Sequence, residues 1–279
     1  MDIAVTLGRG SNAYCTRSGD TGAVAPLRGP ERRAGYAGAV ARRAPARTAD
    51  GAEATGPGPG PSHATARYLE AIYYLDHEGE EVRPGRLADW LAVSPPTVTV
   101  AVQRLVRDGL VAVHSDRTIV LTPVGALAAA AAVRRHRVVE CWLTVELGFD
   151  WVTADAEAER VAYTLSDVVL DRLFERLGEP TTCPHGNEIP GHGPVQRDLV
   201  CLTELAAGHP ARVSRISELA EHDAPQVLGL LDSEGLVPGA AVTVEAEAPL
   251  AGVMRLSVDG KPVALSAAMA ASVWVERPA

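Results

Sequence analysis

The main period of the hydrophobic pattern changes near residue 200, and that change constrains the fold more than any other feature. From residue 66 to about 177, apolar residues recur at helical spacing, as at Leu69 and Ile72. From Val200 onward they alternate with polar residues in short runs. Spacing of three and four buries one face of a helix, whereas alternation buries one face of a strand. The pattern predicts an α+β protein that is mainly helical, with a small C-terminal β-barrel.

Residues 62–125 predict three short helices followed by a hairpin. The first helix covers residues 66–78 and the second residues 83–92, while Ser94 opens the third as a good N-cap and Gly109 ends it. Residues 110–114 and 118–122 then alternate as two strands around a short turn. This order is typical of a winged helix-turn-helix DNA-binding domain.

The rest of the chain divides into further segments. Residues 126–178 predict a helical dimerisation domain, with one helix ending near Leu147 and another from Thr153 to Leu177. Their apolar stripes exceed what one helix pair can bury, which favours a homodimer. Residues 179–198 are rich in Pro and Gly and predict a linker, and residues 199–279 predict the barrel, with strands at 211–216, 241–246, 254–258, 263–265 and 273–276. Residues 1–61 hold 11 Gly and 6 Pro and predict a disordered extension.

Composition limits the classes of protein to consider. The 279 residues suit about two domains, and a hydrophobic fraction of 47% supports a core. The net charge of −9 excludes a surface that is basic throughout, but a small basic face would still bind DNA. We expect no membrane segment and no signal peptide. Four scattered cysteines without a Cys-x-x-Cys pair fit free thiols in a reducing cytoplasm better than a disulfide framework.

The order of several motifs resembles that of the diphtheria-toxin-repressor family of iron- and manganese-dependent transcriptional regulators. The motifs are Arg67-Tyr68-Leu69-Glu70-Ala71-Ile72-Tyr73, Ser94-Pro95-Pro96-Thr97-Val98, Arg107-Asp108-Gly109-Leu110-Val111, Leu121-Thr122-Pro123-Val124-Gly125, Arg135-His136-Arg137 and the stretch 183–191. Residues 202–277 resemble the small barrel that is fused to these repressors and also occurs in ferrous-iron-transport accessory proteins. The resemblance implies a repressor that binds double-stranded operator DNA as a homodimer.

The third helix would be the recognition helix of such a domain, with its N-terminal residues toward the bases. These residues are small and suit thymine methyl groups and phosphates. The expected DNA-contacting residues are Ser94, Pro96, Thr97, Thr99, Gln103, Arg104 and Arg107, with Arg86 and Arg117 on phosphates. The alternative is that each arginine is an ordinary solvated charge.

The resemblance also implies an ancillary metal site for Fe(II) or Mn(II). Its positions are His136, Glu140, Asp155, Asp223 and Gln226, all of them residue types that bind metal. His136 and Glu140 lie four residues apart, hence on one face of one helix. The alternative is that His136 belongs to a surface run of arginines and that Asp155 only favours the positive end of a helix dipole.

The family's primary metal site is degenerate here. Its positions hold Arg67, Glu159, Ala162 and Tyr163, of which only Glu159 is a good ligand. We therefore predict that this site binds no transition metal, and hypothesise that Arg67 and Glu159 form an ion pair across it. Cys183 and His185 have no partner pair nearby in the sequence, which favours a turn over a zinc site.

Three classes of function compete at this point. The leading one is a metal-responsive DNA-binding repressor, with constitutive, metal-independent DNA binding by the same fold as an alternative. An enzyme is disfavoured, because the chain has no nucleophile elbow, P-loop or dinucleotide-binding motif. The third is a protein-interaction module, in which the barrel binds a partner instead of taking part in a metal site.

Overall fold

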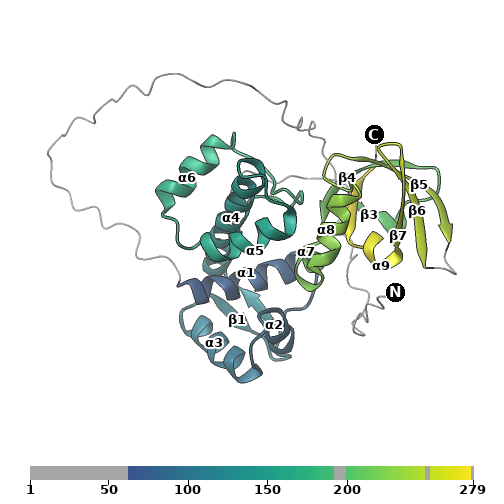
Figure 1. The fold of residues 1–279 in the computed structure, drawn as a ribbon. Coiled ribbons are helices and arrows are strands. Elements are labelled where there is room, and N and C mark those ends of the chain that lie inside the picture. The colour runs from purple at the N-terminus through teal and green to yellow at the C-terminus, as the bar shows by residue number, and fades with distance from the viewer. Residues whose placement is uncertain (1–61, 192–198, 249–251, 278–279) are drawn as a thin grey trace, which may run out of the picture.

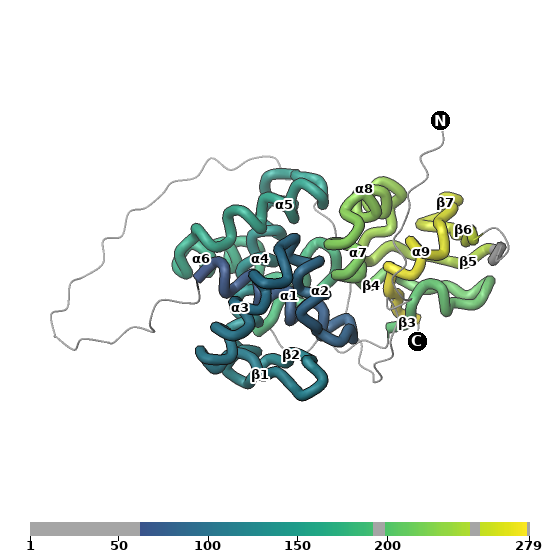
Figure 2. The backbone as a smooth tube through the Cα atoms, turned by 90° about the horizontal axis from the view of Figure 1, so that it is seen from below, coloured from purple at the N-terminus to yellow at the C-terminus, as the bar shows by residue number. Residues whose placement is uncertain are grey.

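In the computed structural model of the protein, residues 62–191, 199–248 and 252–277 are described (Figure 1). The extension at 1–61, which the sequence predicts to be disordered, lies outside these residues. The described chain forms a helical part built from α1 to α6 and an antiparallel sheet, with α7 and α8 between the two in both views (Figures 1 and 2). The predicted α+β fold class is confirmed.

The N-terminal domain has the predicted order of three helices and a hairpin. Helices α1 (His63–His77), α2 (Pro84–Trp90) and α3 (Pro95–Arg107) precede the strands β1 (Val111–Val113) and β2 (Ile119–Leu121), which pair antiparallel. Ser94 caps α3 because its side chain accepts a hydrogen bond from the Thr97 N–H. Leu69, Ile72 and Leu105 meet in one buried cluster, as their spacing predicts.

Helix α4 (Pro123–Val145) leaves this domain along the hairpin. A Cβ at Gly125 would lie 1.7 Å from the Leu110 carbonyl oxygen, so only glycine allows the first turn of α4 to lie against the chain that precedes β1. The single helix predicted from Thr153 to Leu177 is wrong. Two helices occupy this region, α5 (Trp151–Val161) and α6 (Asp167–Arg176), because Ser166 caps a new helix by accepting from the Val169 N–H.

Residues 179–191, which we call the strap, are packed against the protein although the sequence predicted a linker there. Cys183, His185, Asn187 and Ile189 of the strap are buried. Gly186 has φ +86°, and a Cβ there would lie 2.0 Å from the Ser214 carbonyl oxygen. The Pro and Gly residues that suggested a solvated linker instead let the strap turn sharply and lie directly on the sheet.

The C-terminal domain is one six-stranded antiparallel sheet with the strand order β3-β8-β4-β5-β6-β7. The strands are β3 (Leu199–Cys201), β4 (Pro210–Ile216), β5 (Ala241–Ala248), β6 (Val253–Val258), β7 (Lys261–Ser266) and β8 (Val273–Glu276). Figure 1 shows the sheet curled on itself, with α9 (Ala267–Ala270) beside it. The 3₁₀ turn η1 (Leu202–Glu204) directly follows β3. The predicted small barrel is therefore present, while β3 and the helices α7 (Glu218–Asp223) and α8 (Pro225–Ser233) were not predicted.

Two expectations concern the whole chain. Among the helices that the structure describes, none is long and apolar enough to cross a bilayer. Cys141 and Cys183 are buried free thiols, as predicted. Cys201 is disulfide-bonded, so the expectation of a free thiol is wrong at that residue.

Candidate metal centre and DNA interface

Three of the five residues predicted for the ancillary metal site come together between α4 and α5. His136 and Glu140 lie one turn apart on α4, and Asp155 faces them from α5. The Nε2 atom of His136 lies 3.2 Å from Oδ1 of Asp155, and one ligand atom from each of the three residues falls within 4.8 Å of the others. Glu140 is buried, while the other two are partly buried. The arrangement offers one imidazole and two carboxylates to a cation.

The structure does not bring Asp223 and Gln226 into this group. Asp223 ends α7 and accepts hydrogen bonds from Arg86 Nη2 at 2.8 Å and Nη1 at 3.3 Å, while Gln226 is exposed on α8. Arg86 also donates from Nε to Glu80 at 2.8 Å. Arg86, which the sequence predicted to contact phosphate, therefore joins α2 to the C-terminal domain. Asp223 at the end of α7 contacts α2 and not α4, and no local sequence pattern predicts this orientation.

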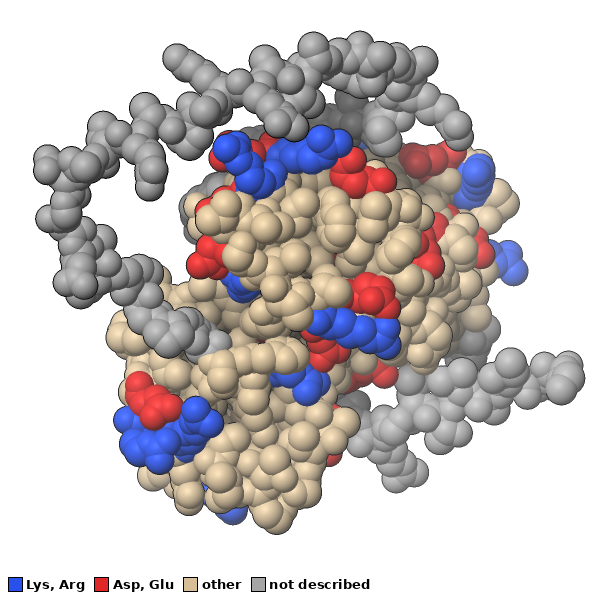
Figure 3. All heavy atoms as spheres, turned by 60° about the vertical axis from the view of Figure 1, so that its left-hand side comes forward, with Lys and Arg blue, Asp and Glu red and all other residues tan. Residues whose placement is uncertain are grey.

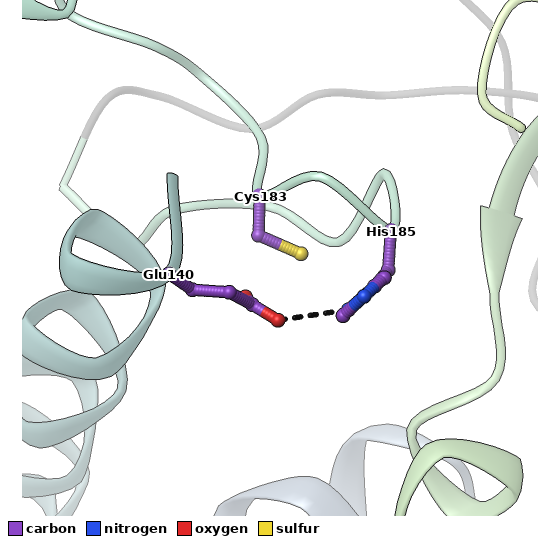
Figure 4. A group of neighbouring side chains, drawn as sticks. All are labelled: Glu140, Cys183 and His185. Carbon is purple, nitrogen blue, oxygen red and sulfur yellow. Dashed lines mark ion pairs between the residues drawn. The ribbon is translucent and has the colours of Figure 1, made fainter. Parts of the chain in front are cut away.

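A second group of ligand atoms forms around the same glutamate, from residues that the sequence argument set aside. Figure 4 shows Glu140 of α4 facing Cys183 and His185 of the strap. One ligand atom from each lies within 4.8 Å of the others, and all three residues are buried. The turn that the sequence favoured is present, because the Gly186 N–H donates to the Cys183 carbonyl oxygen at 2.9 Å. The partner that Cys183 and His185 lacked in the sequence is Glu140, a glutamate some 40 residues earlier.

Glu221 of α7 completes this second group. Its Oε2 lies 3.4 Å from His185 Nδ1, and its Oε1 accepts a hydrogen bond of 2.8 Å from Asn187 Nδ2. Asn187 also donates to the Ile216 carbonyl oxygen at 3.0 Å, so it holds the glutamate against the strap. The motif Cys-Pro-His-Gly-Asn was the only sequence signal for this group, and the glutamate on α7 had none.

Burial and neighbouring charges shift the pKa values of these groups. Burial alone would lower the pKa of His136, but Asp155 and Glu140 raise it to about 10. Burial raises the pKa of the Cys183 thiol to about 12, and that of Glu221 to about 8. A cation bound here would favour the thiolate and the carboxylates and would take the imidazole lone pairs. Imidazole, thiolate and carboxylate donors together fit a transition-metal ion.

The positions of the degenerate primary site form direct contacts between α1 and α5. Arg67 Nη2 lies 2.9 Å from Glu159 Oε1, as the ion-pair hypothesis required, and both side chains are about half exposed. Ala162 is fully buried and Tyr163 stacks on His63 with ring centroids 4.7 Å apart. Among these four residues only Glu159 has a ligand that suits Fe(II) or Mn(II), and its carboxylate is already paired with Arg67.

The other predicted DNA-contacting residues are exposed on α3 and at the wing tip. They are Ser94, Pro96, Thr97, Thr99, Gln103, Arg104, Arg107 and Arg117. Arg104 and Arg107 both approach Asp108, at 3.6 and 3.4 Å, which reduces their net charge. Figure 3 shows blue side chains with one red group gathered at the end of the molecule that contains α3. Arg83, which donates to the Asp116 carbonyl oxygen in the wing, was not predicted.

Three family models match consecutive parts of the chain. Residues 62–119 match the N-terminal DNA-binding domain of iron-dependent repressors, residues 122–191 their metal-binding and dimerisation domain, and residues 200–277 the FeoA domain. Among named proteins, the chain is 40% identical to the iron-dependent repressor IdeR of Mycobacterium tuberculosis over 225 residues, covering 76% of this chain and 96% of that one. It is 34% identical to the diphtheria toxin repressor of Corynebacterium diphtheriae over 221 residues, with the same coverage.

Two solved structures superpose on most of this chain. A manganese-dependent transcriptional repressor in complex with manganese superposes with a TM-score of 0.68 at 31% identity, covering 77% of this chain and all of the other. A structure of ScaR with bound Zn²⁺ superposes with a TM-score of 0.63 at 26% identity, covering 77% of this chain and 99% of that one.

Proposed function

This chain belongs to the iron-dependent repressors, and on that premise we propose that it represses transcription by binding operator DNA when a divalent metal occupies the groups around Glu140. It is a metal-responsive DNA-binding regulator and not an enzyme. The observation that carries the metal site is the convergence of His136, Asp155, Cys183 and His185 on one buried carboxylate.

Fe(II) or Mn(II) is the metal that we propose. The ligands that would hold metal are His136, Glu140 and Asp155 from the helices, and Cys183, His185 and Glu221 from the strap and α7. When bound, the ion supplies positive charge that ties these segments together. Neighbouring side chains orient the ligands. Asn187 donates a hydrogen bond that orients Glu221, and Asp155 is hydrogen-bonded to His136 and orients its ring.

The residues of α7 extend this tie to the DNA-binding domain. Glu78, which ends α1, accepts hydrogen bonds from Ser217 Oγ at 3.2 Å and from the Glu218 N–H at 3.1 Å. Glu218 in turn pairs with Arg137 of α4 in a buried ion pair. Glu221, as a metal ligand on the same helix, would hold α7 against α4 and α1, and so help to set the orientation of α3 toward DNA.

The proposed DNA interface consists of the exposed N-terminal end of α3 and the wing. Ser94, Pro96, Thr97 and Thr99 suit thymine methyl groups and phosphates, and Arg117 in the wing would bind a phosphate. Val100, exposed beside them, offers a further apolar contact.

A homodimer would place two such interfaces on one operator. Leu127 on α4 and Val168 on α6 are large apolar residues that remain exposed in the single chain, which supports dimerisation through the helical part. A protein that acts on chromosomal DNA would work in the cytoplasm, which is the location we propose.

The decisive experiment measures operator binding of the full chain by electrophoretic mobility shift, with chelator and then with Mn(II) or Fe(II). We expect tight binding only with metal, and loss of the metal response in Glu140→Gln. The matched control is Glu146→Gln, an exposed glutamate at the end of the same helix, which should behave as the wild type. Equal binding with chelator and with metal would overturn the proposed metal response.

A further inference from the structure

The two groups of ligand atoms share one member, Glu140. His136 and Asp155 approach its carboxylate from the helices, and Cys183 and His185 approach it from the strap. With Glu140 counted in both, each group offers three donors within 4.8 Å of one another, which is the number of protein ligands that an open metal site uses. A carboxylate has two oxygens and can bind one cation with each.

The group formed by Glu140, Cys183 and His185 contains an imidazole whose nitrogens are free to bind a cation. His185 is fully buried, and neither of its ring nitrogens has a hydrogen-bond partner, although Nδ1 lies 3.0 Å from Glu140 Oε1. A buried imidazole without hydrogen bonds costs stability unless something else satisfies it. The ring also meets Trp151 edge-on, with centroids 4.8 Å apart, which fixes its orientation.

A cavity of about 130 Å³ lies among these residues. Its lining includes His136, Glu140, Asp155, Cys183 and Glu221, so it borders both groups. About 10–15 Å³ of such space holds one water. The cavity is therefore large enough for more than one ion with bound water.

The charges of the two groups also match two ions. Glu140, Asp155, Glu221 and the thiolate of Cys183 would carry four negative charges. The buried arginine beside them, Arg137, is already paired with Glu218, and Arg215 is paired with Glu78. Two divalent cations balance four such charges, whereas with one cation the remaining groups must keep their protons.

We propose that the protein binds two divalent ions side by side, with the Glu140 carboxylate bridging them. His136 and Asp155 hold one ion, and this imidazole and oxygen set suits Mn(II) or Fe(II). Cys183 and His185, with Glu221, hold the other, and the thiolate gives this position a preference for softer ions such as Fe(II), Co(II) or Zn(II). The inference rests on the proposed metal site but not on DNA binding.

The test counts metal on the full chain in the absence of DNA. After removal of metal with a chelator, the protein is dialysed against Co(II), and bound cobalt is measured per chain. We expect two equivalents in the wild type and in the Glu146→Gln control, and one in Asp155→Asn and in Cys183→Ser. Glu140→Gln should weaken both. One equivalent in the wild type would overturn the proposal.

Spectroscopy assigns the two positions. A charge-transfer absorption band from thiolate to Co(II) should be lost in Cys183→Ser and kept in Asp155→Asn. With two equivalents of Co(II) bound, the wild type should show the paramagnetic resonance of a coupled pair, because a bridging carboxylate connects the ions. Two uncoupled ions would contradict the bridge while leaving the count intact. Thermal unfolding of each variant shows whether a lost ion reflects a lost fold. A protein that binds two ions yet ignores metal in the DNA assay would refute the proposed function alone.

Discussion

At the scale of single residues, burial is what distinguishes the proposed metal ligands from ordinary charged side chains on a helix surface. Glu140 is only 2% exposed, and His185 not at all. An exposed carboxylate four residues after a histidine is a common feature of helix surfaces, but a buried one must be compensated. Here the charge of Glu140 is compensated by neighbouring groups, such as His136, that are protonated when no metal is bound.

Metal affinity should therefore rise with pH. With burial opposing, Asp155 and Glu140 raise the pKa of His136 to about 10, and burial raises that of Cys183 to about 12, so both groups are protonated near pH 7. Metal must displace these protons. Between pH 6.5 and 8.5 the Kd for Co(II) should fall about tenfold per pH unit for each proton released. Titration at several pH values measures this.

The matched variant for this prediction is Cys183→Ser, which should release one proton fewer and show a shallower dependence on pH. A Kd that does not change with pH would mean that these groups are not ligands.

At the scale of elements, the strap decides whether the centre forms. It brings Cys183 and His185 to α4 only because the chain turns at Gly186 directly against β4. Its backbone is tied to the sheet by the hydrogen bond from the Ile216 N–H to the His185 carbonyl oxygen, 2.9 Å long. The strap is thus part of the C-terminal domain's surface as much as a connection to it.

Replacing Gly186 with alanine should detach the strap. A left-handed φ costs an L-residue about 1–2 kcal/mol, and here the new Cβ would also lie 2.0 Å from the Ser214 carbonyl oxygen. We expect a loss in the free energy of unfolding beyond that cost, and weaker metal binding, measured by urea unfolding and metal counting. Gly191→Ala is the control, because its φ is +97° but no atom lies within 4 Å of the new Cβ. Equal losses in the two variants would contradict the role of close packing.

At the scale of the whole molecule, contacts between domains would carry the effect of metal binding to the DNA-binding domain. The C-terminal domain touches the DNA-binding domain through Arg86 with Asp223, and through Trp90 stacked on His222 with centroids 3.7 Å apart. Arg67 of α1 pairs with Glu159 of α5, at the positions of the degenerate primary site. Two sets of protein contacts therefore join the DNA-binding domain to the rest of the chain.

The pair of Arg67 and Glu159 should contribute modestly to operator affinity. Both side chains are about half exposed, so solvent screens them, and a coupling of about 0.2–1 kcal/mol is expected. A double-mutant cycle with Arg67→Ala and Glu159→Ala, measured as operator Kd at saturating Mn(II), should show at most about a fivefold effect. Arg160→Ala, which breaks an exposed ion pair within α5, is the control. An operator Kd that is the same in Arg67→Ala and the wild type would remove this role.

The sequence by itself determined the fold class, the DNA-binding helices, the hairpin and most strands. These follow from local rules: the periodicity of Leu69 and Ile72, the caps at Ser94 and Thr122, and alternation in the strands. The break between α5 and α6 was missed because the apolar pattern runs through it, while the cap at Ser166 decided the structure.

Only the tertiary structure decided which polar groups meet. His136 and Glu140 could be paired from helical spacing, but Glu140, His185 and Glu221 come from α4, the strap and α7, which lie far apart in the sequence. The same packing pairs Asp223 with Arg86, although the sequence predicted Asp223 as a metal ligand. Helices and strands follow from residues that are close together in the sequence. A buried polar group instead depends on residues from different domains, because charged side chains that lose water must be paired with one another.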